Sequence, residues 1–539
     1  MRSAFFFRII FFVSSFFSVA RGQESALDVF LQPLEIEGLG GVQSFAFAQH
    51  EGKWLVIGGR TDGLHQRQPF ASFDIAGHNT EIIVIDPVNK FFRTRSNHVL
   101  PPPIREQLSA TNTEFLQEGD ILYIIGGYGF SPTANNHITF PHLCAVDVPG
   151  LINAVLENKD ILPFFRQISD EKFAVTGGYL HKLYNTYYLV GGQRFTGRYN
   201  PQGPGHGPGF MQAYTNAIRK FTIEDDGASL KVIHKAEITD EVNLHRRDYN
   251  VANQIFPDGR FGLTAFSGVF QKDVDLPFLN CLNIDSSGYS VQPDFNQYYN
   301  HYHCAHLPMY SQNNQEMHTL FFGGISQYYD VNGVLTRDDN VPFVNTIARV
   351  TRDKEGKMAE YKLQHTMPGL LGSGSEFILS EDMPVFDNGV LNLDVLDRDT
   401  THVGYIYGGI NSTAPNIFFT NTGVQSKAES RIFEVFLIKN AATSTDNLNH
   451  QSQGGLGLII YPNPGKENFS VKFYLKNQVD VRLIIRDLAG NKIKCLNLGI
   501  MPAGHQDIHL EDTFDGQNIL LFSLEAGDQV AVQKWVMSK

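Results

Sequence analysis

The stretch LYIIGG, residues 122–127, decides the fold because it recurs along the chain. Matching runs are WLVIGG ending at Gly58-Gly59, YYLVGG at Gly191-Gly192, LFFGG at Gly323-Gly324 and GYIYGG at Gly408-Gly409. A degenerate copy, LTAFSG, carries Ser267-Gly268 instead. Each run is rich in β-branched and aromatic residues, which indicates a buried strand. The glycines permit positive φ, so the chain turns sharply out of a packed sheet.

Further strand signals surround most of these runs. Downstream strands begin with asparagine, as in NTEIIVID at Asn79 and NTIARV at Asn345, and upstream strands resemble FAFAQ at Phe45–Gln49. Each unit therefore offers about four strands, which is the content of one propeller blade. Internal repetition of this kind predicts a repeat architecture.

The repeated double glycine resembles the kelch repeat, in which Gly-Gly closes the second strand of each blade. The resemblance covers residues 27–440, and Phe91 and Phe92 stand where the family carries a tryptophan in the first blade. It implies an all-β fold, a six-bladed kelch-type β-propeller. We expect residues 27–36 to complete the last blade, because a ring of sheets otherwise leaves exposed edges. The fold itself does not specify an activity.

Composition excludes one large class of partner. The chain has 539 residues and a formal net charge of −13. Phosphate binding needs a basic footprint, so nucleic acid is not an expected partner. Beyond the N-terminus no stretch is long and apolar enough to predict a membrane span.

The N-terminal and C-terminal segments of the chain carry patterns that predict export from the cell. Arg2, Arg8 and the apolar run 9–17 form a secretory signal over residues 1–22, with cleavage expected after Gly22 and Ala20 as the alternative. Residues 441–457 are small and polar, as a linker is. Residues 458–539 alternate apolar and polar residues between turns, which predicts a small β-sandwich C-terminal domain.

This last domain resembles the type A C-terminal sorting domain of the type IX secretion system. YPNP at 461–464, RDLAGNKI at 486–493, PAG at 502–504 and the terminal KWVMSK carry the resemblance, whereas Gly516-Gln517-Asn518 replaces the family's Gly-x-Tyr. It implies the type IX secretion machinery as a partner. The protein is then secreted or held at the cell surface, after export through the periplasm of a Gram-negative bacterium.

No cofactor or metal site is predicted from spacing. Three cysteines, Cys144, Cys281 and Cys304, show no pairing pattern and are expected to be buried free thiols, with Cys495 in the tail. His301 and His303 would share one face of a strand, so a two-histidine metal site completed by another blade stays an alternative to histidines that bond across blades. Galactose oxidase has a related propeller, but its cysteine-linked tyrosine has no counterpart here.

Candidate ligand-binding residues lie on the loops that leave each double glycine and at the starts of innermost strands, which we expect to meet at the mouth of the central channel. Long loops without structure of their own are usually functional. Alternation predicts that Arg246 and Asp248 face one side and Arg247 the other. The candidates are Arg60, Asp62, Arg194, Arg198, Arg246, Arg247, Asp248, His301, His303 and Tyr328.

Two functions remain open from the sequence. Arginine forks suit carboxylates, so the site either binds a glycan or a protein partner through the long-loop face, or is that of an epimerase or lyase acting on an acidic sugar. Kelch propellers that epimerise sialic acid use a similar kind of site. The same arginines could instead pair with Asp62, Asp248 and Asp330 and fix the loops. No catalytic residue is assigned, and a deep pocket with a perturbed acid or base would favour the enzyme.

Overall fold

The computed structural model describes residues 27–202, 209–331, 334–398 and 400–439, and in the C-terminal part 456, 458–461, 463, 465, 468–486, 492–511, 514, 519–527 and 529–536. The predicted signal peptide with its cleavage site and nearly all of the predicted linker lie outside these residues. The chain divides into two compact units, of which one is Leu27–Lys439 and the other contains the C-terminal strands. In the described part, no helix is long and apolar enough to cross a membrane.

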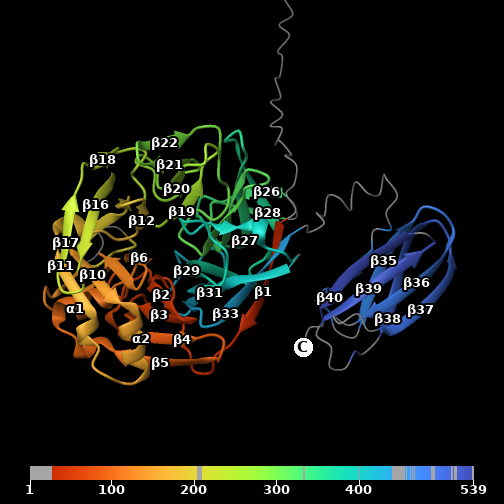
Figure 1. The fold of residues 1–539 in the computed structure, drawn as a ribbon, viewed down its shortest axis with the longest axis horizontal. Coiled ribbons are helices and arrows are strands. Elements are labelled where there is room, and N and C mark those ends of the chain that lie inside the picture. Colours follow the sequence, from red (N-terminus) through yellow and green to blue (C-terminus); the bar gives the residue numbers. More distant parts are fainter. Residues whose placement is uncertain are drawn as a thin grey trace, which may run out of the picture. The chain divides into compact units, whose positions relative to one another are not determined.

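The unit Leu27–Lys439 is built from small antiparallel sheets (Figure 1). Six of them share one plan, in which the four strands pair in a simple meander. They comprise β2 (Ala46–His50), β3 (Lys53–Ile57), β4 (Glu81–Asp86) and β5 (Phe91–Ser96); β6 (Glu114–Glu118), β7 (Ile121–Ile125), β10 (His142–Asp147) and β11 (Phe165–Ser169); β12 (Tyr179–Leu183), β13 (Thr186–Val190), β16 (Ala217–Asp225) and β17 (Leu230–His234); β19 (Asn250–Ile255), β20 (Phe261–Phe266), β21 (Cys281–Asp285) and β22 (Gly288–Gln292); β23 (His306–Ser311), β24 (Glu316–Ile325), β27 (Phe343–Arg352) and β28 (Met358–Thr366); and β29 (Leu370–Leu379), β31 (Thr400–Ser412), β33 (Ile432–Lys439) and β1 (Leu27–Leu34).

The last sheet is completed from the other end of the chain. β1 pairs antiparallel with β33 from Leu27↔Lys439 to Leu34↔Ile432. The predicted role of the N-terminal stretch is therefore confirmed. The pairing covers the edge that β33 would otherwise expose.

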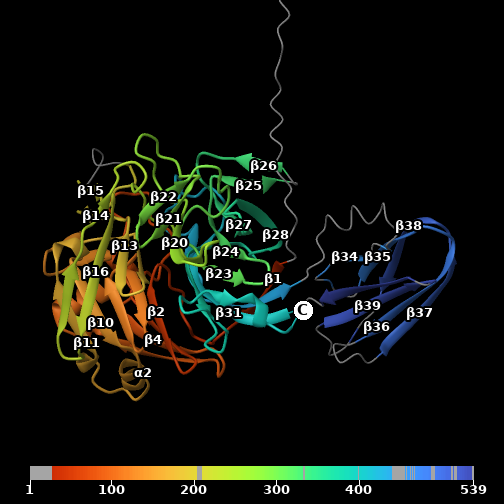
Figure 2. The same cartoon turned by 45° about the horizontal axis from the view of Figure 1, so that its top comes forward.

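Additional elements lie in the connections. β18 (Ile238–Thr239), β30 (Leu391–Asn392) and β32 (Ser426–Ala428) extend three of the sheets, while β8 (Tyr128–Ser131), β9 (Asn136–Thr139), β14 (Gln193–Thr196) and β15 (Met211–Tyr214) form a loop sheet. β25 (Tyr328–Val331) and β26 (Val334–Arg337) form a hairpin, and Figure 2 shows it along the same upper side of the unit as β14 and β15. The helices are α1 (Pro102–Leu108) and α2 (Val148–Leu156), with short 3-10 turns η1 (Ile75–Gly77), η2 (Asn97–Val99), η3 (Leu162–Phe164), η4 (Glu171–Phe173) and η5 (Leu393–Val395).

Second strands are apolar throughout because both of their faces are buried. In β3, Leu55 and Ile57 enter one hydrophobic cluster, whereas Trp54 and Val56 enter another. Side chains alternate across a strand, so these clusters lie on opposite faces of the sheet. The first cluster includes residues of β7 and the second includes residues of β31, which places the sheet between two neighbours.

The double glycines interlock neighbouring sheets. Both residues of every pair have positive φ, for example +70° at Gly58 and +81° at Gly59. The N–H of Gly59 donates to the carbonyl of Ala110 at 2.8 Å, at the entry to the next sheet. A Cβ on Gly58 would lie 2.7 Å from that carbonyl oxygen, so a larger residue would push the sheets apart. The degenerate copy keeps the geometry, with φ of +51° at Ser267.

A closed ring of backbone hydrogen bonds joins the starts of the first strands, several of which surround a common centre in Figure 1. Each N–H donates to the carbonyl of the equivalent residue in the preceding sheet, at 2.7–3.3 Å. Five of the six members have positive φ, His303 being the exception. The ring residues are Ser44, Asn112, Gly177, Asp248, His303 and Gly374.

The C-terminal unit also consists of strands. β34 (Ile459–Tyr461), β35 (Asn468–Leu475) and β38 (Gly504–Glu511) form one sheet, and β36 (Val479–Arg486), β37 (Lys492–Met501), β39 (Ile519–Ala526) and β40 (Gln529–Val536) form the other. Phe469 of the first sheet and Leu483, Phe522 and Trp535 of the second share one buried cluster, as two stacked sheets require. Leu456, assigned to the linker from sequence, is buried in this cluster.

All four cysteines are free. Cys144, Cys281 and Cys304 are buried, as expected from the sequence, and Cys495 is exposed. Burial raises the pKa of the Cys144 thiol to about 12, so this side chain acts as a small apolar group.

Candidate functional site

Two cavities meet at the backbone ring. We call the first, of about 640 Å³, the loop pocket, because its wall comes from the loops that follow the double glycines. We call the second, of about 220 Å³, the strand chamber, because residues of β6 and β12 line it. The ring residues Asn112, Asp248 and His303 line both cavities.

The repeat places equivalent residues around the loop pocket. The residue before a ring position forms an isolated bridge with the residue after a double glycine, as in Gln43↔Arg60, Thr111↔Tyr128 and Thr176↔Gln193. All six of these residues line the loop pocket. Two positions that carry no special sequence signal therefore supply much of the wall.

Arg247 and Asp248 are the predicted residues that lie at the centre of this arrangement. Nη1 of Arg247 donates to Asp248, Nε donates to Tyr214 Oη at 3.1 Å, and the guanidinium carbon lies 5.1 Å from the centre of the Phe270 ring. Burial is the largest single effect and lowers the pKa of Arg247, but the Asp248 carboxylate and the neighbouring tyrosines together raise the pKa, so the guanidinium stays charged. Asp248 lines both cavities, whereas Arg247 lines the loop pocket.

The predicted alternation of these side chains is wrong. Asp248 has a φ of +49°, so it is not part of a regular strand, and β19 begins only at Asn250. This left-handed residue brings Asp248 to the same cavity wall as Arg247, whereas Arg246 lies away from the loop pocket.

Arg246 belongs to the scaffold. It is 1% exposed, and it donates to the carbonyls of Asn243 at 2.7 Å, Ser267 at 2.6 Å and Asn280 at 3.0 Å. Its guanidinium also lies 3.9 Å from the centre of the Phe278 ring. Burial lowers its pKa to about 10, which leaves it charged at neutral pH.

His301 also lies away from the pocket, contrary to the expected convergence. The side chain is fully buried, with Nε2 2.9 Å from the Gln297 carbonyl and Nδ1 accepting from the Gln327 N–H at 3.1 Å. Burial lowers its pKa to about 4, so it is neutral. The hydrogen bonds of this histidine hold the loop that follows Gly324.

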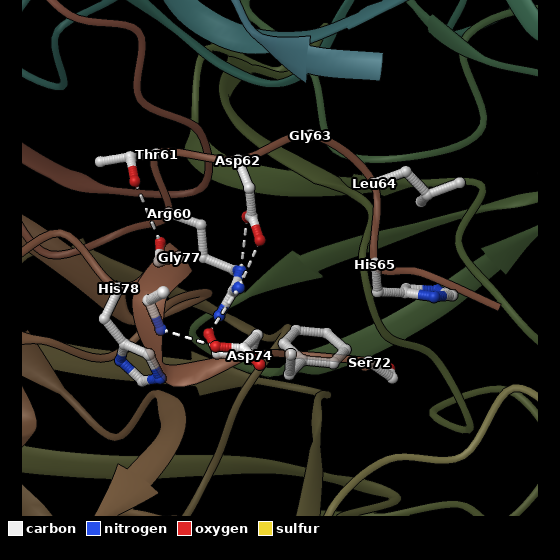
Figure 3. Close-up of polar contacts among 12 residues, drawn as sticks. Arg60, Thr61, Asp62, Gly63, Leu64, His65, Ser72, Asp74, Gly77 and His78 are labelled. Carbon is white, nitrogen blue, oxygen red and sulfur yellow. Dashed lines mark hydrogen bonds and ion pairs between the residues drawn. The ribbon is translucent and has the colours of Figure 1, made fainter. Parts of the chain in front are cut away.

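Arg60 and Asp62 fasten the first long loop (Figure 3). Nε of Arg60 donates to Asp62 Oδ1 at 2.7 Å, and Nη2 donates to Asp62 Oδ2 at 2.5 Å and to the Asp74 carbonyl at 2.9 Å. The guanidinium also lies 5.3 Å from the centre of the Phe73 ring. Arg60 forms part of the pocket wall, yet protein groups occupy most of its donors.

Three other candidates do not line the loop pocket. Arg194 is exposed and pairs with Glu171 at 2.7 Å. Arg198 donates through Nε to the Ser72 carbonyl at 2.6 Å, and Tyr328 packs edge-on against Tyr298 with ring centres 5.0 Å apart. Each of these side chains supports a loop near the pocket.

The pocket wall is strongly aromatic, which the candidate residues did not indicate. Rings contribute from five of the six sheets' loops, and neighbouring rings contact each other, for example Phe73 and Tyr128 at 5.2 Å. The aromatic lining residues are Phe73, Tyr128, Phe195, Tyr199, Phe210, Tyr214, Phe270, Tyr302, Phe418 and Phe419. Adjacent Phe418 and Phe419 on the last long loop were the sequence signal that could have identified part of this wall.

The basic side chains that line the loop pocket differ in whether an acidic residue of the protein already pairs with them. Among the residues that line the pocket, Arg60, Arg247 and Lys272 pair with Asp62, Asp248 and Glu241. Arg67 lies over Phe419, 5.2 Å from the ring centre, and forms no ion pair with any described residue. Arg67 is therefore the cation best placed to receive an anion from solvent.

The strand chamber has a different character. His303 Nε2 lies 2.9 Å from Glu376 Oε1, although the two atoms do not meet hydrogen-bond geometry. Burial lowers the pKa of His303, but Glu376 outweighs this and raises it, which favours an imidazolium–carboxylate pair. His303 therefore directs its charge to the chamber. In the described part of the chain, no group of three His, Cys, Asp or Glu side chains is arranged to hold a metal ion.

Comparisons with known proteins assign no family to the chain. No family model matches the chain, and no curated protein matches it. Among solved structures, it is similar to a fungal alcohol oxidase of the AA5 family in complex with copper, with 7% identity, a TM-score of 0.36 and coverage of 93% of this chain and 98% of that one. It is also similar to YjhT, with 12% identity, a TM-score of 0.25 and coverage of 60% and 99%. Scores this low carry no argument about activity.

Proposed function

We propose that the protein is a secreted or cell-surface six-bladed kelch-type β-propeller that binds a glycan with an acidic sugar in its loop pocket. The six meander sheets, the double-glycine contacts and the closure by β1 support the propeller assignment. One closed ring of six hydrogen bonds fits six blades, because each sheet contributes one member.

The observation that carries the ligand assignment is the combination of an aromatic wall with Arg67. Sugar rings pack their apolar faces on aromatic side chains, and an arginine fork matches a carboxylate. Arg67 lies against Phe419 with no ion-pair partner among the described residues. Amide side chains of Gln43, Asn112 and Gln193 line the same pocket and can bond hydroxyl groups.

A second candidate is an epimerase or lyase acting on the same acidic sugar. The pocket volume of about 640 Å³ favours it, because a shallow surface would suffice for binding alone. A base must also lie within reach of the sugar. His303 lines the pocket, but Glu376 raises its pKa and favours the imidazolium form, which cannot accept a proton, and Glu376 itself lines only the strand chamber. Binding is therefore the preferred function.

A glycan array with the mature full-length protein tests the assignment. We expect glycans with acidic sugars to bind, and Arg67→Ala to weaken binding at least about tenfold, since a hydrogen bond to a charged group is worth ~1.5–3 kcal/mol. Arg194→Ala is the matched control, because its exposed side chain lies off the pocket. Retained binding in Arg67→Ala, or a preference for neutral glycans, contradicts the proposal.

The same ligand distinguishes binding from catalysis. A bound sugar incubated with the protein in deuterium oxide keeps all of its C–H signals in NMR spectra if the site only binds. Loss of one C–H signal through exchange, or the appearance of an unsaturated sugar, would establish the epimerase or lyase.

Export by the type IX secretion machinery is proposed from the C-terminal strands and their resemblance to sorting domains. Deletion of residues 461–539 should leave a folded protein in the periplasm, because the propeller unit carries its own cores. Fractionation and immunoblotting measure this in a host that has the machinery. Normal secretion of the truncated protein would remove the support for a sorting role.

A further inference from the structure

The strand chamber contains buried polar atoms without partners. Glu114 at the start of β6 is 2% exposed, and its Oε1 accepts from the Gly178 N–H at 2.8 Å. Its Oε2 and the hydroxyl of Tyr179 are buried and meet no partner. Buried polar atoms are nearly always bonded, so unpaired ones around a cavity indicate that a ligand supplies the missing contacts.

Apart from histidines, the ionisable side chains with an ordinary charge at neutral pH that line the strand chamber are all acidic. Glu114, Asp248 and Glu376 line it, and no lysine or arginine does. Asp248 is paired with Arg247 and Glu376 with His303, which leaves Glu114 as the carboxyl group without a cationic partner in the cavity. Arg219 lowers the pKa of Glu114 electrostatically, but its own ion-pair partner is Glu237 at 3.7 Å.

The walls of the chamber are aromatic. Phe47 and Phe115 meet edge to face with ring centres 5.4 Å apart, and Tyr179, Tyr249 and Phe377 complete the lining. Aromatic faces attract cations, and several rings around one carboxylate form the kind of site that holds alkylated ammonium groups. Gln117 and His181, which also line the chamber, are only partly buried.

We propose that the strand chamber is a second binding site, which takes a small alkylammonium cation. Its ammonium group lies against the rings and faces Glu114. The volume of about 220 Å³ accommodates a cation of a few carbon atoms and not a sugar chain. The phenyl and phenol rings offer no metal ligands, and the described His and carboxyl side chains form no group arranged to hold a metal ion, so the lining favours an organic cation.

Choline is the probe, and its neutral carbon analogue, in which tert-butyl replaces trimethylammonium, is the control. Isothermal titration of the full-length protein should give binding of choline and at least tenfold weaker binding of the analogue. Because both compounds have the same shape, the difference reports the charge. Equal binding of the two, or binding of neither, overturns the proposal, and so does a crystal structure with choline that shows only ordered water in the chamber.

Variants locate the site. Glu114→Gln keeps the shape of the side chain and should weaken choline binding at least tenfold. Glu118→Gln on the same strand is the matched control, because Glu118 pairs with Lys182 outside the chamber. Glycan binding in the loop pocket should be unchanged in both variants, so failure here leaves the proposed function intact. Full retention of choline binding in Glu114→Gln overturns the proposal.

Discussion

The loop pocket and the strand chamber share the ring residues Asn112, Asp248 and His303, yet their chemistry differs. The pocket has side chains of both signs, because Asp248, Asp275 and Asp339 line it together with four basic residues, Arg60, Arg67, Arg247 and Lys272. The chamber is lined by carboxyl groups and has no lysine or arginine. Because the backbone ring is the same for both, the contrast comes entirely from the side chains that project to either side.

The difference teaches how a repeat acquires specificity. Ring positions have one backbone role but different side chains, and only Asp248 and His303 among them can carry a charge. Each pairs with a partner of opposite sign, Arg247 for the pocket and Glu376 for the chamber. The repeated backbone thus carries side chains of opposite charge at two equivalent positions, and each is paired with a neighbouring group of opposite sign.

The largest expected effect is on the free energy of unfolding, and it distinguishes Arg246 in the scaffold from Arg247 in the pocket wall. Arg246→Ala should lower the free energy of unfolding by at least about 3 kcal/mol, since three carbonyl groups lose a buried donor at ~1–3 kcal/mol each. Arg247→Ala should lower it much less, because the adjoining pocket admits water to Asp248. Urea unfolding of the two variants measures the difference.

The two variants should rank in the opposite order when acidic-glycan binding is measured instead of stability. Arg247→Ala should weaken acidic-glycan binding, whereas Arg246→Ala, studied at a temperature where it is folded, should not. If Arg247→Ala is the more destabilising variant, Arg247 is a scaffold residue, and the electrostatic contrast between the two cavities loses its main cation.

The sequence predicted the strands and the closure well. Double glycines recur because both residues need positive φ against the next sheet, and this requirement leaves a visible pattern. The apolar second strands follow an equally local rule, whereas the pairing of residues 27–34 with residues 432–439 was predicted from the need to cover an open sheet edge. At the double glycines, the contacts between sheets depend on a backbone conformation that few residues other than glycine adopt, so the sequence shows where these contacts lie.

The candidate site was less predictable. Alternation failed at Asp248, because a single left-handed residue changes which side chains share a face, and aspartate does not require that conformation. Arg60 and Arg67 lie on one loop. The sequence offered pairing with Asp62 as an alternative for Arg60, and the structure shows it, but only the fold reveals that Phe419 faces Arg67. Glu114 had no signal at all, since one acidic residue before a strand is common.

The smaller expected effect concerns the charge of the chamber. Burial raises the pKa of Glu114 from 4.5 to about 8; the nearby Asp248 carboxylate adds to this, while the Gly178 N–H and Arg219 oppose it. A raised carboxyl pKa means that the folded state binds more protons than the unfolded state between these values. Stability therefore falls as pH rises from about 5 to 8, by at most about 1.4 kcal/mol per pH unit for this group.

Other groups titrate over the same range, including Glu360, whose pKa burial also raises to about 8. The informative quantity is therefore the stability of Glu114→Gln minus that of the natural protein, which should grow over this pH window. Choline should reduce the difference, because a bound cation favours the ionised carboxylate and stabilises only the natural protein. Urea unfolding at several pH values, with and without choline, measures both effects. A difference that does not change with pH would show that Glu114 is ionised in the folded chamber already, and that its charge is satisfied by the protein.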